Sequence, residues 1–272
     1  MRLIYKCSNG EEFELENLLG LRISSDPFHS HLWSPSTVRQ KYGAKVTGFS
    51  KDAVRYSAAF KVDMPYKETA ELLDGLTKCF DIDIAKQTPG KIYFGEQYIS
   101  CYGTELKITP DGFAQNVEAS FYCPYPFWIF ERKYEWLPSS SEDEFLDFPF
   151  DFPFDFHTEN GSSYAINEGV TDCDFKLTIY GPVQNPSVLI NGINVGGYVS
   201  LEANDVLIID TKDYSVTKIA GSGARTDCFR YRYKDQDIFS KLPSGGHSVS
   251  WEKSFGVDLV LYQERSIPAW SV

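Results

Sequence analysis

Apolar and polar residues alternate over short runs along most of the chain, which is the pattern of half-buried β-strands. In the first half these runs are rich in Tyr, Phe, Val and Ile, the residues that fit a pleated surface. Ser8-Asn9-Gly10 lies between the first two runs and predicts a hairpin, because Asn-Gly favours the tight turns that join adjacent strands. The predicted strands are Leu3–Cys7, Glu12–Glu16, Leu21–Ser24, Lys45–Phe49, Val54–Val62, Lys91–Phe94, Gln97–Tyr102, Glu105–Thr109 and Gln115–Cys123.

One segment has the spacing of a helix rather than of a strand. From Tyr66 to about Phe80, apolar side chains recur three or four residues apart. Pro65 precedes the segment, and acidic residues lie in its first turn, where they suit the helix dipole. Gly75 in the middle is less favourable. The pattern predicts one helix packed on a sheet.

A change of composition near the middle of the chain predicts a domain boundary. Pro124-Tyr125-Pro126-Phe127-Trp128 ends the first set of strands, and a polar stretch rich in Ser and Glu follows at 137–144. We therefore predict an N-terminal β domain with one helix at residues 1–138 and a second β domain at residues 139–272. The aromatic residues at 121–128 could stack on sugar rings, but packing at the domain junction is the favoured interpretation. The residues assigned to this junction are Pro124, Pro126, Phe127 and Trp128.

The second domain opens with a repeat of the four residues Asp-Phe-Pro-Phe at 147–156. In a strand, alternate side chains point to opposite faces, so all the rings would share one face and the Asp and Pro residues the other. Each proline removes a backbone N–H along one edge only, which describes an edge strand. The alternative is an extended linker with exposed rings. The residues assigned to the strand are Phe148, Pro149, Phe150, Phe152, Pro153 and Phe154, and Phe156 extends the pattern.

The remaining sequence predicts a second set of short strands. They are Phe175–Tyr180, Ser187–Ile190, Val195–Leu201, Val206–Asp210, Ser215–Ile219, Ser248–Trp251 and Val257–Tyr262. Asn191-Gly192 and Thr211–Tyr214 are predicted hairpin turns. Short strands with turns at these intervals predict a β-sandwich or barrel of Greek-key or jelly-roll kind, so we predict a mainly β chain.

Composition narrows the classes of function. The formal net charge of −12 argues against binding to nucleic acid or to anionic lipid, since both need a basic surface. The N-terminal residues lack the apolar region of a signal peptide, and no stretch approaches the roughly 20 apolar residues of a membrane span. We expect a protein that is made in the cytoplasm. Its six cysteines form no CxxC pair and are expected to be reduced.

The sequence has few arrangements that support catalysis. It contains none of the nucleophile-elbow, zinc-protease, P-loop or EF-hand motifs, and Gly192–Gly197 indicates a hairpin rather than a dinucleotide loop. The 38 acidic residues leave a glycosidase pair open, because sequence does not give the distance between two carboxylates. We predict that the protein is not an enzyme and that it has no cofactor.

The chain has four histidines, and none of them is predicted to bind a metal. His29 and His31 could form half of a metal site, but nothing nearby supplies the other ligands, so a polar loop is favoured and no metal is predicted. His157 and His247 are predicted to be solvated turn residues. The segment Phe229–Tyr233 alternates rings and guanidinium groups, which predicts a half-exposed strand with cation–π contacts along it rather than a ligand site.

Three features follow one another along the chain. Pro126-Phe127-Trp128 closes the first domain, the Phe-Pro repeat at Phe148–Phe156 opens the second, and a C-terminal pattern follows. That pattern comprises Asn185-Pro186, Ile190-Asn191-Gly192, Asp205–Thr211, Phe239, Leu242–Gly246, Tyr262–Arg265 and Trp270. In this order and spacing the features resemble the distal tail proteins of long-tailed, siphovirus-type phages and prophages of Gram-positive bacteria, over nearly the whole chain.

The resemblance implies a virion protein at the tail tip that forms a ring, usually of six copies, and joins the tail tube to the baseplate. The first domain would form the ring around a channel. The second would be a galectin-like or carbohydrate-binding-module-like sandwich outside it. The implied partners are copies of the chain itself, the tail tube protein, and baseplate or receptor-binding proteins, without direct contact to nucleic acid or membrane. The acidic charge is compatible with this, because it repels passing DNA.

Two other functions stay open at this point. A carbohydrate-binding or host-recognition module would bind cell-wall polysaccharide through exposed aromatic residues and would not need to assemble. A glycan-acting enzyme would release a product, and this release would disappear when a carboxylate pair is changed.

The Phe-Pro repeat gives a first testable prediction. If Phe150 and Phe152 face a core, changing either to Ala should lower the free energy of unfolding by ~3–5 kcal/mol, measured by urea denaturation. A loss below about 1 kcal/mol would instead indicate the exposed linker.

Overall fold

The described residues form two compact units, each of which is treated by itself. The computed structural model describes residues 3–15, 21–23, 27–62, 66–111, 114–138 and 163–270. Unit 1 comprises Met1–Phe130 with Glu264–Val272, and unit 2 comprises Glu131–Gln263. The predicted edge strand at 147–156 and His157 lie outside the described residues, so their interpretation stays a prediction.

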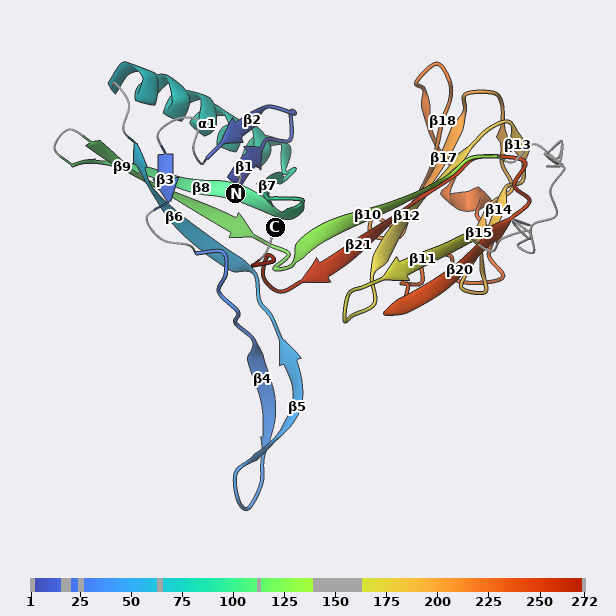
Figure 1. Cartoon of the computed structure of the whole chain (residues 1–272), viewed down its shortest axis with the longest axis horizontal. Coiled ribbons are helices and arrows are strands. Elements are labelled where there is room, and N and C mark those ends of the chain that lie inside the picture. The colour runs from blue at the N-terminus through green and yellow to red at the C-terminus, as the bar shows by residue number, and fades with distance from the viewer. Residues whose placement is uncertain are drawn as a thin grey trace, which may run out of the picture. The chain divides into compact units, whose positions relative to one another are not determined.

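Unit 1 is built of antiparallel strands and one helix (Figure 1). Its elements are β1 (Leu3–Lys6), β2 (Glu12–Glu14), β3 (Leu21–Ile23), β4 (Ser34–Arg39), β5 (Ala44–Ser50), β6 (Val54–Val62), α1 (Tyr66–Lys86), β7 (Gly90–Phe94), β8 (Gln97–Asp111), β9 (Ala114–Cys123) and the start of β10 (Trp128–Trp136). Pairing runs from β2 through β1, β7, β8, β9 and β6 to β3. The predicted hairpin between β1 and β2 is confirmed, with Gly10 at a φ of 97°.

Strand β8 replaces two strands predicted from the sequence. The runs at Gln97–Tyr102 and Glu105–Thr109 are continuous, and the register against β9 shifts between Gly103 and Glu105. A bulge of this kind adds an unpaired residue and interrupts the alternation of side chains between the two faces. The alternation of apolar and polar residues is therefore interrupted at the bulge, although the hydrogen-bonded strand continues through it.

Helix α1 covers the sheet of unit 1 with its apolar side. The ring of Phe80 lies edge-on to Tyr5 of β1, with centroids 5.1 Å apart, and to Phe121 of β9 at 5.8 Å. All three side chains are buried, so rings from three elements meet in one core. The expected helix on a sheet is confirmed.

The helix continues past its predicted end at Phe80 and stops at Lys86, where Gln87 adopts a left-handed φ of 52°. The extension was missed because the next inward-facing residue is charged. Asp83 is fully buried and accepts hydrogen bonds from the Tyr5 hydroxyl and, at 2.8 Å, from the Ser8 backbone N–H. Burial would raise the pKa of the Asp83 carboxyl, but the hydrogen bonds from Ser8 and Tyr5 outweigh it and hold that pKa below its ordinary value.

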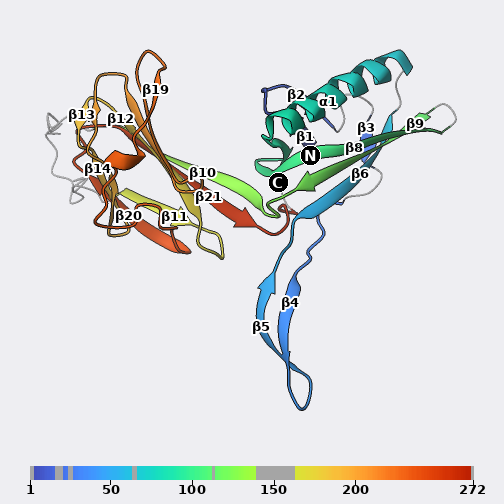
Figure 2. The ribbon, with the colours of Figure 1, turned by 180° about the vertical axis from the view of Figure 1, so that it is seen from behind.

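Unit 2 is a β-sandwich of two antiparallel sheets (Figures 1 and 2). Its elements after β10 are β11 (Ser163–Asn167), β12 (Asp174–Tyr180), β13 (Val183–Gln184), β14 (Ser187–Ile190), β15 (Ile193–Gly196), β16 (Ser200–Leu201), β17 (Val206–Asp210), β18 (Ser215–Ile219), β19 (Arg225–Asp227), the 3-10 helix η1 (Phe229–Tyr231), β20 (Gly245–Trp251) and β21 (Val257–Arg265). One sheet has the order β19-β18-β17-β12-β21-β10, and the other has the order β11-β20-β14-β15. Apolar side chains from both sheets form one buried cluster, as the predicted sandwich requires.

Both predicted hairpins of unit 2 are confirmed. Strands β14 and β15 are joined by Asn191 and Gly192 with φ of 49° and 81°, and two successive positive φ angles are what a type I′ turn needs. Strands β17 and β18 are joined by Thr211–Tyr214, with Tyr214 at a φ of 49°.

The two units do not test the predicted domain bounds of 1–138 and 139–272, which stay a prediction. Strand β10 begins in unit 1 and continues into unit 2 as far as Trp136, and the last described residues, 264–270, return to unit 1. Pro124 and Pro126 lie between the end of β9 at Cys123 and the start of β10 at Trp128, and the first segment of unit 1 ends two residues later, at Phe130.

Two predictions of local structure in unit 2 are wrong. Phe229–Tyr231 form η1 instead of a strand, and the Arg232 guanidinium lies 4.0 Å from the Phe229 ring centroid, within one turn. His247 is buried and not solvated, with its Nε2 2.7 Å from the Pro243 carbonyl. Both outcomes involve neighbours distant in sequence: the Tyr198 N–H donates to the Tyr231 carbonyl at 2.7 Å, and His247 of β20 pairs with Ala165 of β11.

The bulge in β8 gives a test of the core of unit 1. A Cβ added at Gly103 would lie 2.3 Å from the Phe80 ring, which is too close for any contact. Gly103→Ala should therefore lower the free energy of unfolding by ~1–3 kcal/mol, measured by urea denaturation.

Gly48→Ala is the matched control, since Gly48 of β5 has nothing within 4 Å of a built Cβ. Its effect should stay within about 0.5 kcal/mol. Equal losses in the two variants would contradict the role assigned to the contact with Phe80.

Candidate assembly and binding surfaces

The described residues offer no metal centre. No group of three or more His, Cys, Asp or Glu side chains among them could hold an ion. His29, one of the two loop histidines, stacks on Trp270 with ring centroids 4.1 Å apart and lies edge-on to Phe94 at 5.2 Å. His31 is exposed in the segment before β4. His29 therefore packs against aromatic rings.

Within the described part of the chain, no helix combines the length and the apolar character that crossing a membrane would demand.

Strands β4 and β5 form a two-stranded ribbon, here called the arm (residues 34–50). The two strands pair only with each other and extend away from the other strands of unit 1 (Figures 1 and 2). Every residue of β4 is exposed, and so is every residue of β5 except Gly48, which is partly buried. Neither face of the arm is covered by another described element.

Four apolar side chains of the arm face solvent. Val38, Tyr42, Val46 and Phe49 are 57%, 84%, 48% and 64% exposed. A two-stranded hairpin without a covered face is marginally stable in water. Val38 pairs with Lys45 and Val46 with Thr37, so both faces of the ribbon carry exposed apolar side chains, and such surfaces mark a site of contact with another molecule.

The arm is also strongly basic for this chain. The arm contains Arg39, Lys41 and Lys45 and no acidic residue, and with Lys51 at its base the stretch 34–51 carries a net charge of +4. Since the whole chain carries −12, the rest of it carries −16. The arm is therefore attracted to the acidic surface of any second copy of the chain.

Aromatic residues hold the base of the arm. The Lys51 ammonium donates to the Ser266 carbonyl and lies 5.4 Å from the centroid of Phe127, whose ring is 5.9 Å from that of Trp33. Burial lowers the pKa of Lys51. Contacts with Ser266 in the C-terminal segment and with Phe127 before β10 thus fix the point at which the arm departs from the other strands of unit 1.

The residues predicted as a junction motif lie in different environments. Trp128 is fully buried against Phe28, with ring centroids 5.8 Å apart, and Pro126 is buried. Phe127 is half-buried at the base of the arm, and Pro124 is exposed. Because the Trp128 ring is inaccessible, it cannot stack on a sugar. The role of these residues at a domain junction stays a prediction.

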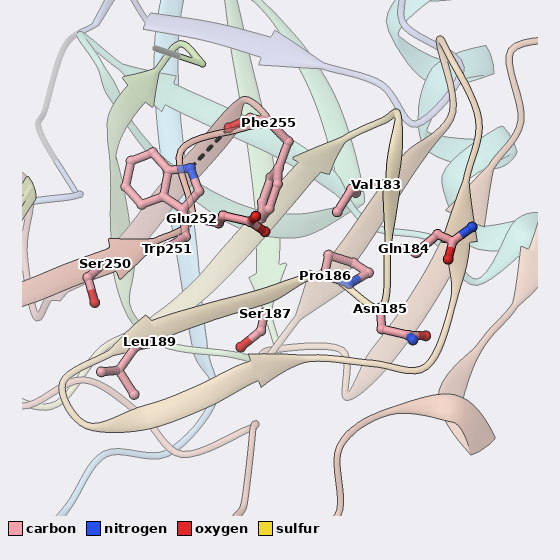
Figure 3. Close-up of a pocket in the computed structure, with 10 residues that line it drawn as sticks. All are labelled: Val183, Gln184, Asn185, Pro186, Ser187, Leu189, Ser250, Trp251, Glu252 and Phe255. Carbon is pink, nitrogen blue, oxygen red and sulfur yellow. Dashed lines mark hydrogen bonds between the residues drawn. The ribbon is translucent and has the colours of Figure 1, made fainter. Parts of the chain in front are cut away.

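Unit 2 has a pocket of about 280 Å³ beside the four-stranded sheet (Figure 3). It is lined by Val183, Gln184, Asn185, Pro186, Ser187, Leu189, Ser250, Trp251, Glu252 and Phe255. These residues come from the segment around β13 and β14 and from the end of β20 and the loop after it. The pocket combines an indole ring, aliphatic side chains, amides, hydroxyls and one carboxylate.

Sequence reasoning missed both surfaces. The lining of the pocket is drawn from two segments more than sixty residues apart, and Asn185-Pro186 in the first of them gives no signal of a ligand site by itself. The arm does have a signal, since residues 34–51 are basic without any acidic residue in an acidic chain. That local excess of charge could have identified it.

Structures of phage tail proteins share this fold. The SPP1 Dit protein (gp 19.1), described as a paradigm of the hub adsorption apparatus in Gram-positive infecting phages, matches with a TM-score of 0.59 at 11% identity, over 97% of this chain and 98% of its own. A chain of the phage P2 baseplate, activated with Ca, matches with a TM-score of 0.62 at 8% identity, over 98% and 100%. A chain of the same baseplate activated with Sr gives 0.60 at 9% identity, over 98% and 99%.

No protein-family model and no curated protein sequence matches the chain. The TM-scores of 0.59–0.62 establish a shared fold over 97–98% of this chain, and at 8–11% identity they establish the fold alone. The resemblance to distal tail proteins is thus confirmed at the level of the fold.

The base of the arm and its exposed part should respond differently to truncation. Phe127→Ala removes a half-buried ring from the Trp33 and Tyr125 contacts and should lower the free energy of unfolding by ~1–3 kcal/mol. Phe49→Ala removes an exposed ring and should change it by less than about 0.5 kcal/mol in the monomeric chain. Urea denaturation at low protein concentration measures both. A large loss for Phe49→Ala would show that the arm packs within its own chain.

Proposed function

We propose that this chain is a structural protein of a phage tail tip, which assembles into a ring of six copies and joins the tail tube to the baseplate or receptor-binding apparatus. The observation that carries the proposal is the arm, an uncovered basic and apolar ribbon. It occurs in a chain whose whole length has the fold of phage hub and baseplate proteins. The protein then acts by assembly and not by catalysis, at the tail tip of the virion.

The arm fits a contact between neighbouring copies in a ring. A ring needs a heterologous interface, in which one patch of a subunit meets a different patch of the next. The arm supplies the first patch, with four basic residues on and beside it and four exposed apolar side chains. The acidic remainder of the neighbour supplies the second. Burial of the apolar side chains there would stabilise a ribbon that has no cover of its own.

The two parts of the chain then have different positions in the assembly. The N-terminal part, predicted as residues 1–138, forms the ring, and the sandwich within 139–272 lies outside it and meets receptor-binding proteins. The net charge of −12 suits a ring around a DNA channel, because repulsion from phosphate prevents the DNA from sticking. No direct contact with nucleic acid or membrane is part of the proposal.

A second candidate function is a carbohydrate-binding or host-recognition module. The pocket of unit 2 favours it, because its mixture of an indole ring and amides is suited to sugars. This function needs no assembly, so the oligomeric state separates the two candidates.

Light scattering of the purified chain over a range of concentrations tests the ring. We expect a discrete species of six times the 30.9 kDa chain. Lys41→Glu with Lys45→Glu should dissociate it, because the arm would then repel the acidic neighbour, while the unfolding midpoint of the monomer stays unchanged. High salt should weaken the wild-type assembly as well.

Arg230→Glu with Lys234→Glu is the matched control, with the same change of charge on exposed residues of unit 2. It should leave the species intact. Equal dissociation by both pairs would contradict a specific role of the arm. A wild-type monomer at all concentrations would shift the balance to the binding module and to partner-dependent assembly.

A further inference from the structure

We propose that the pocket of unit 2 binds one sugar unit of an uncharged polysaccharide. The site lies in the sandwich and uses none of the arm residues, so the inference goes beyond ring assembly and does not rest on it. It is distinct from the sugar platform considered at 121–128, where Phe121 and Trp128 are fully buried and Tyr122 and Tyr125 are partly exposed.

The pocket holds an aromatic surface in a fixed orientation. Trp251 donates its indole N–H to the Phe255 carbonyl at 3.0 Å, the bond dashed in Figure 3. The ring of Trp136 packs against it, with centroids 5.6 Å apart and planes at 49°. Because the only polar group of the indole is already bonded, the ring can offer a ligand only its apolar surface. The carbon-bound hydrogens of a sugar ring are the part of that ligand that such a surface accepts.

Polar groups at the other side of the pocket are held by the backbone. Asn185 donates its N–H to the Val199 carbonyl at 2.9 Å, and its carbonyl accepts from the Tyr233 hydroxyl at 2.8 Å. The backbone of Asn185 is thereby fixed at a φ of 50°, a conformation that asparagine tolerates better than most residues. Its exposed amide carries both donors and an acceptor, which is the combination that neighbouring sugar hydroxyls require.

A carboxylate adds an acceptor and excludes anions. Glu252 and the hydroxyl of Ser250 line the same pocket as the Asn185 amide. Ser187 donates its hydroxyl to the Asn194 side-chain oxygen at 2.6 Å and is less available to a ligand. The lining contains no Lys or Arg, so a phosphate or an acidic sugar would meet only negative charge. The volume of about 280 Å³ lies just below the usual range of small-molecule sites, roughly 300–1,000 Å³, and suits a single sugar unit.

Titration calorimetry with defined oligosaccharides tests the proposal. The probes are tetrasaccharides of N-acetylglucosamine, glucose, galactose, mannose and rhamnose, each added to the full chain. We expect at least one to bind, and to bind equally well at low and high salt, because an uncharged ligand is not screened. If none of the five binds, the proposal is overturned.

Two variants connect binding to the pocket without endangering the fold. Asn185→Gly removes the amide and retains the positive φ, and Glu252→Gln replaces an exposed carboxylate by an isosteric amide. Each should raise the Kd for the sugar by about tenfold or more, which corresponds to about 1.4 kcal/mol of binding free energy. Trp251→Ala should abolish binding, provided that its unfolding midpoint shows a folded chain.

Tyr214→Ala is the matched control, an exposed aromatic residue of unit 2 outside the pocket. It should bind sugar like the wild type. Unchanged affinity in all three pocket variants would overturn the site. Failure of the sugar experiment leaves the mass of the ring unaffected, so the two proposals are separately testable. If a basic peptide binds instead, in a manner that Glu252→Gln and salt both abolish, the site is one for cations and the proposal is wrong.

Discussion

Each sheet of this chain has to bury one face, and the rest of the structure depends on how that requirement is met. In unit 1 helix α1 covers the sheet, and the ring of Phe80 sits so close to β8 that only glycine fits at position 103. In unit 2 a second sheet provides the cover. The arm is the exception, because none of the described elements covers it, and its apolar side chains remain exposed. A ribbon in this condition is either unstable or completed by another molecule, and this is why assembly is the function that the structure supports best.

The sequence predicted those parts of the fold that depend on local chemistry. The turn at Asn191-Gly192 follows from two residues that tolerate positive φ, and strand β6 has the predicted bounds Val54–Val62, since its alternation is uninterrupted. Errors arose where a distant neighbour decides the structure. Helix α1 continues past Phe80, and there the buried Asp83 carboxylate accepts a hydrogen bond from the Tyr5 hydroxyl. Helical periodicity of apolar residues does not anticipate a buried carboxylate. The segment Phe229–Tyr231 curls into η1 although its alternation is that of a strand.

The candidate sites were harder to predict than the fold. The row of aromatic residues at 121–128 suggests one surface, yet Trp128 contributes to a core, whereas Phe127 and Tyr125 contact each other near the base of the arm. The pocket shows the opposite case. Asn185 and Trp251 are far apart in the sequence and unremarkable alone, and they line one site because β14 pairs with β20. The pattern of apolar residues in one segment predicts which side chains are buried. A binding site that strand pairing assembles from two distant segments leaves no such pattern in either segment.

The two surfaces also differ in the forces they use, and this separates their functions physically. In the proposed ring, contacts of the arm would combine burial of apolar side chains with attraction between a basic ribbon and an acidic partner, so they would weaken as salt screens the charges. The lining of the pocket has no basic residue, and the proposed binding of an uncharged sugar would use the indole ring and the amides, which salt does not screen. One residue set can therefore change without the other. A chain with this arrangement can keep its assembly contacts in unit 1 while unit 2 adapts to a different surface polysaccharide, because no residue of the pocket takes part in the arm or in its base.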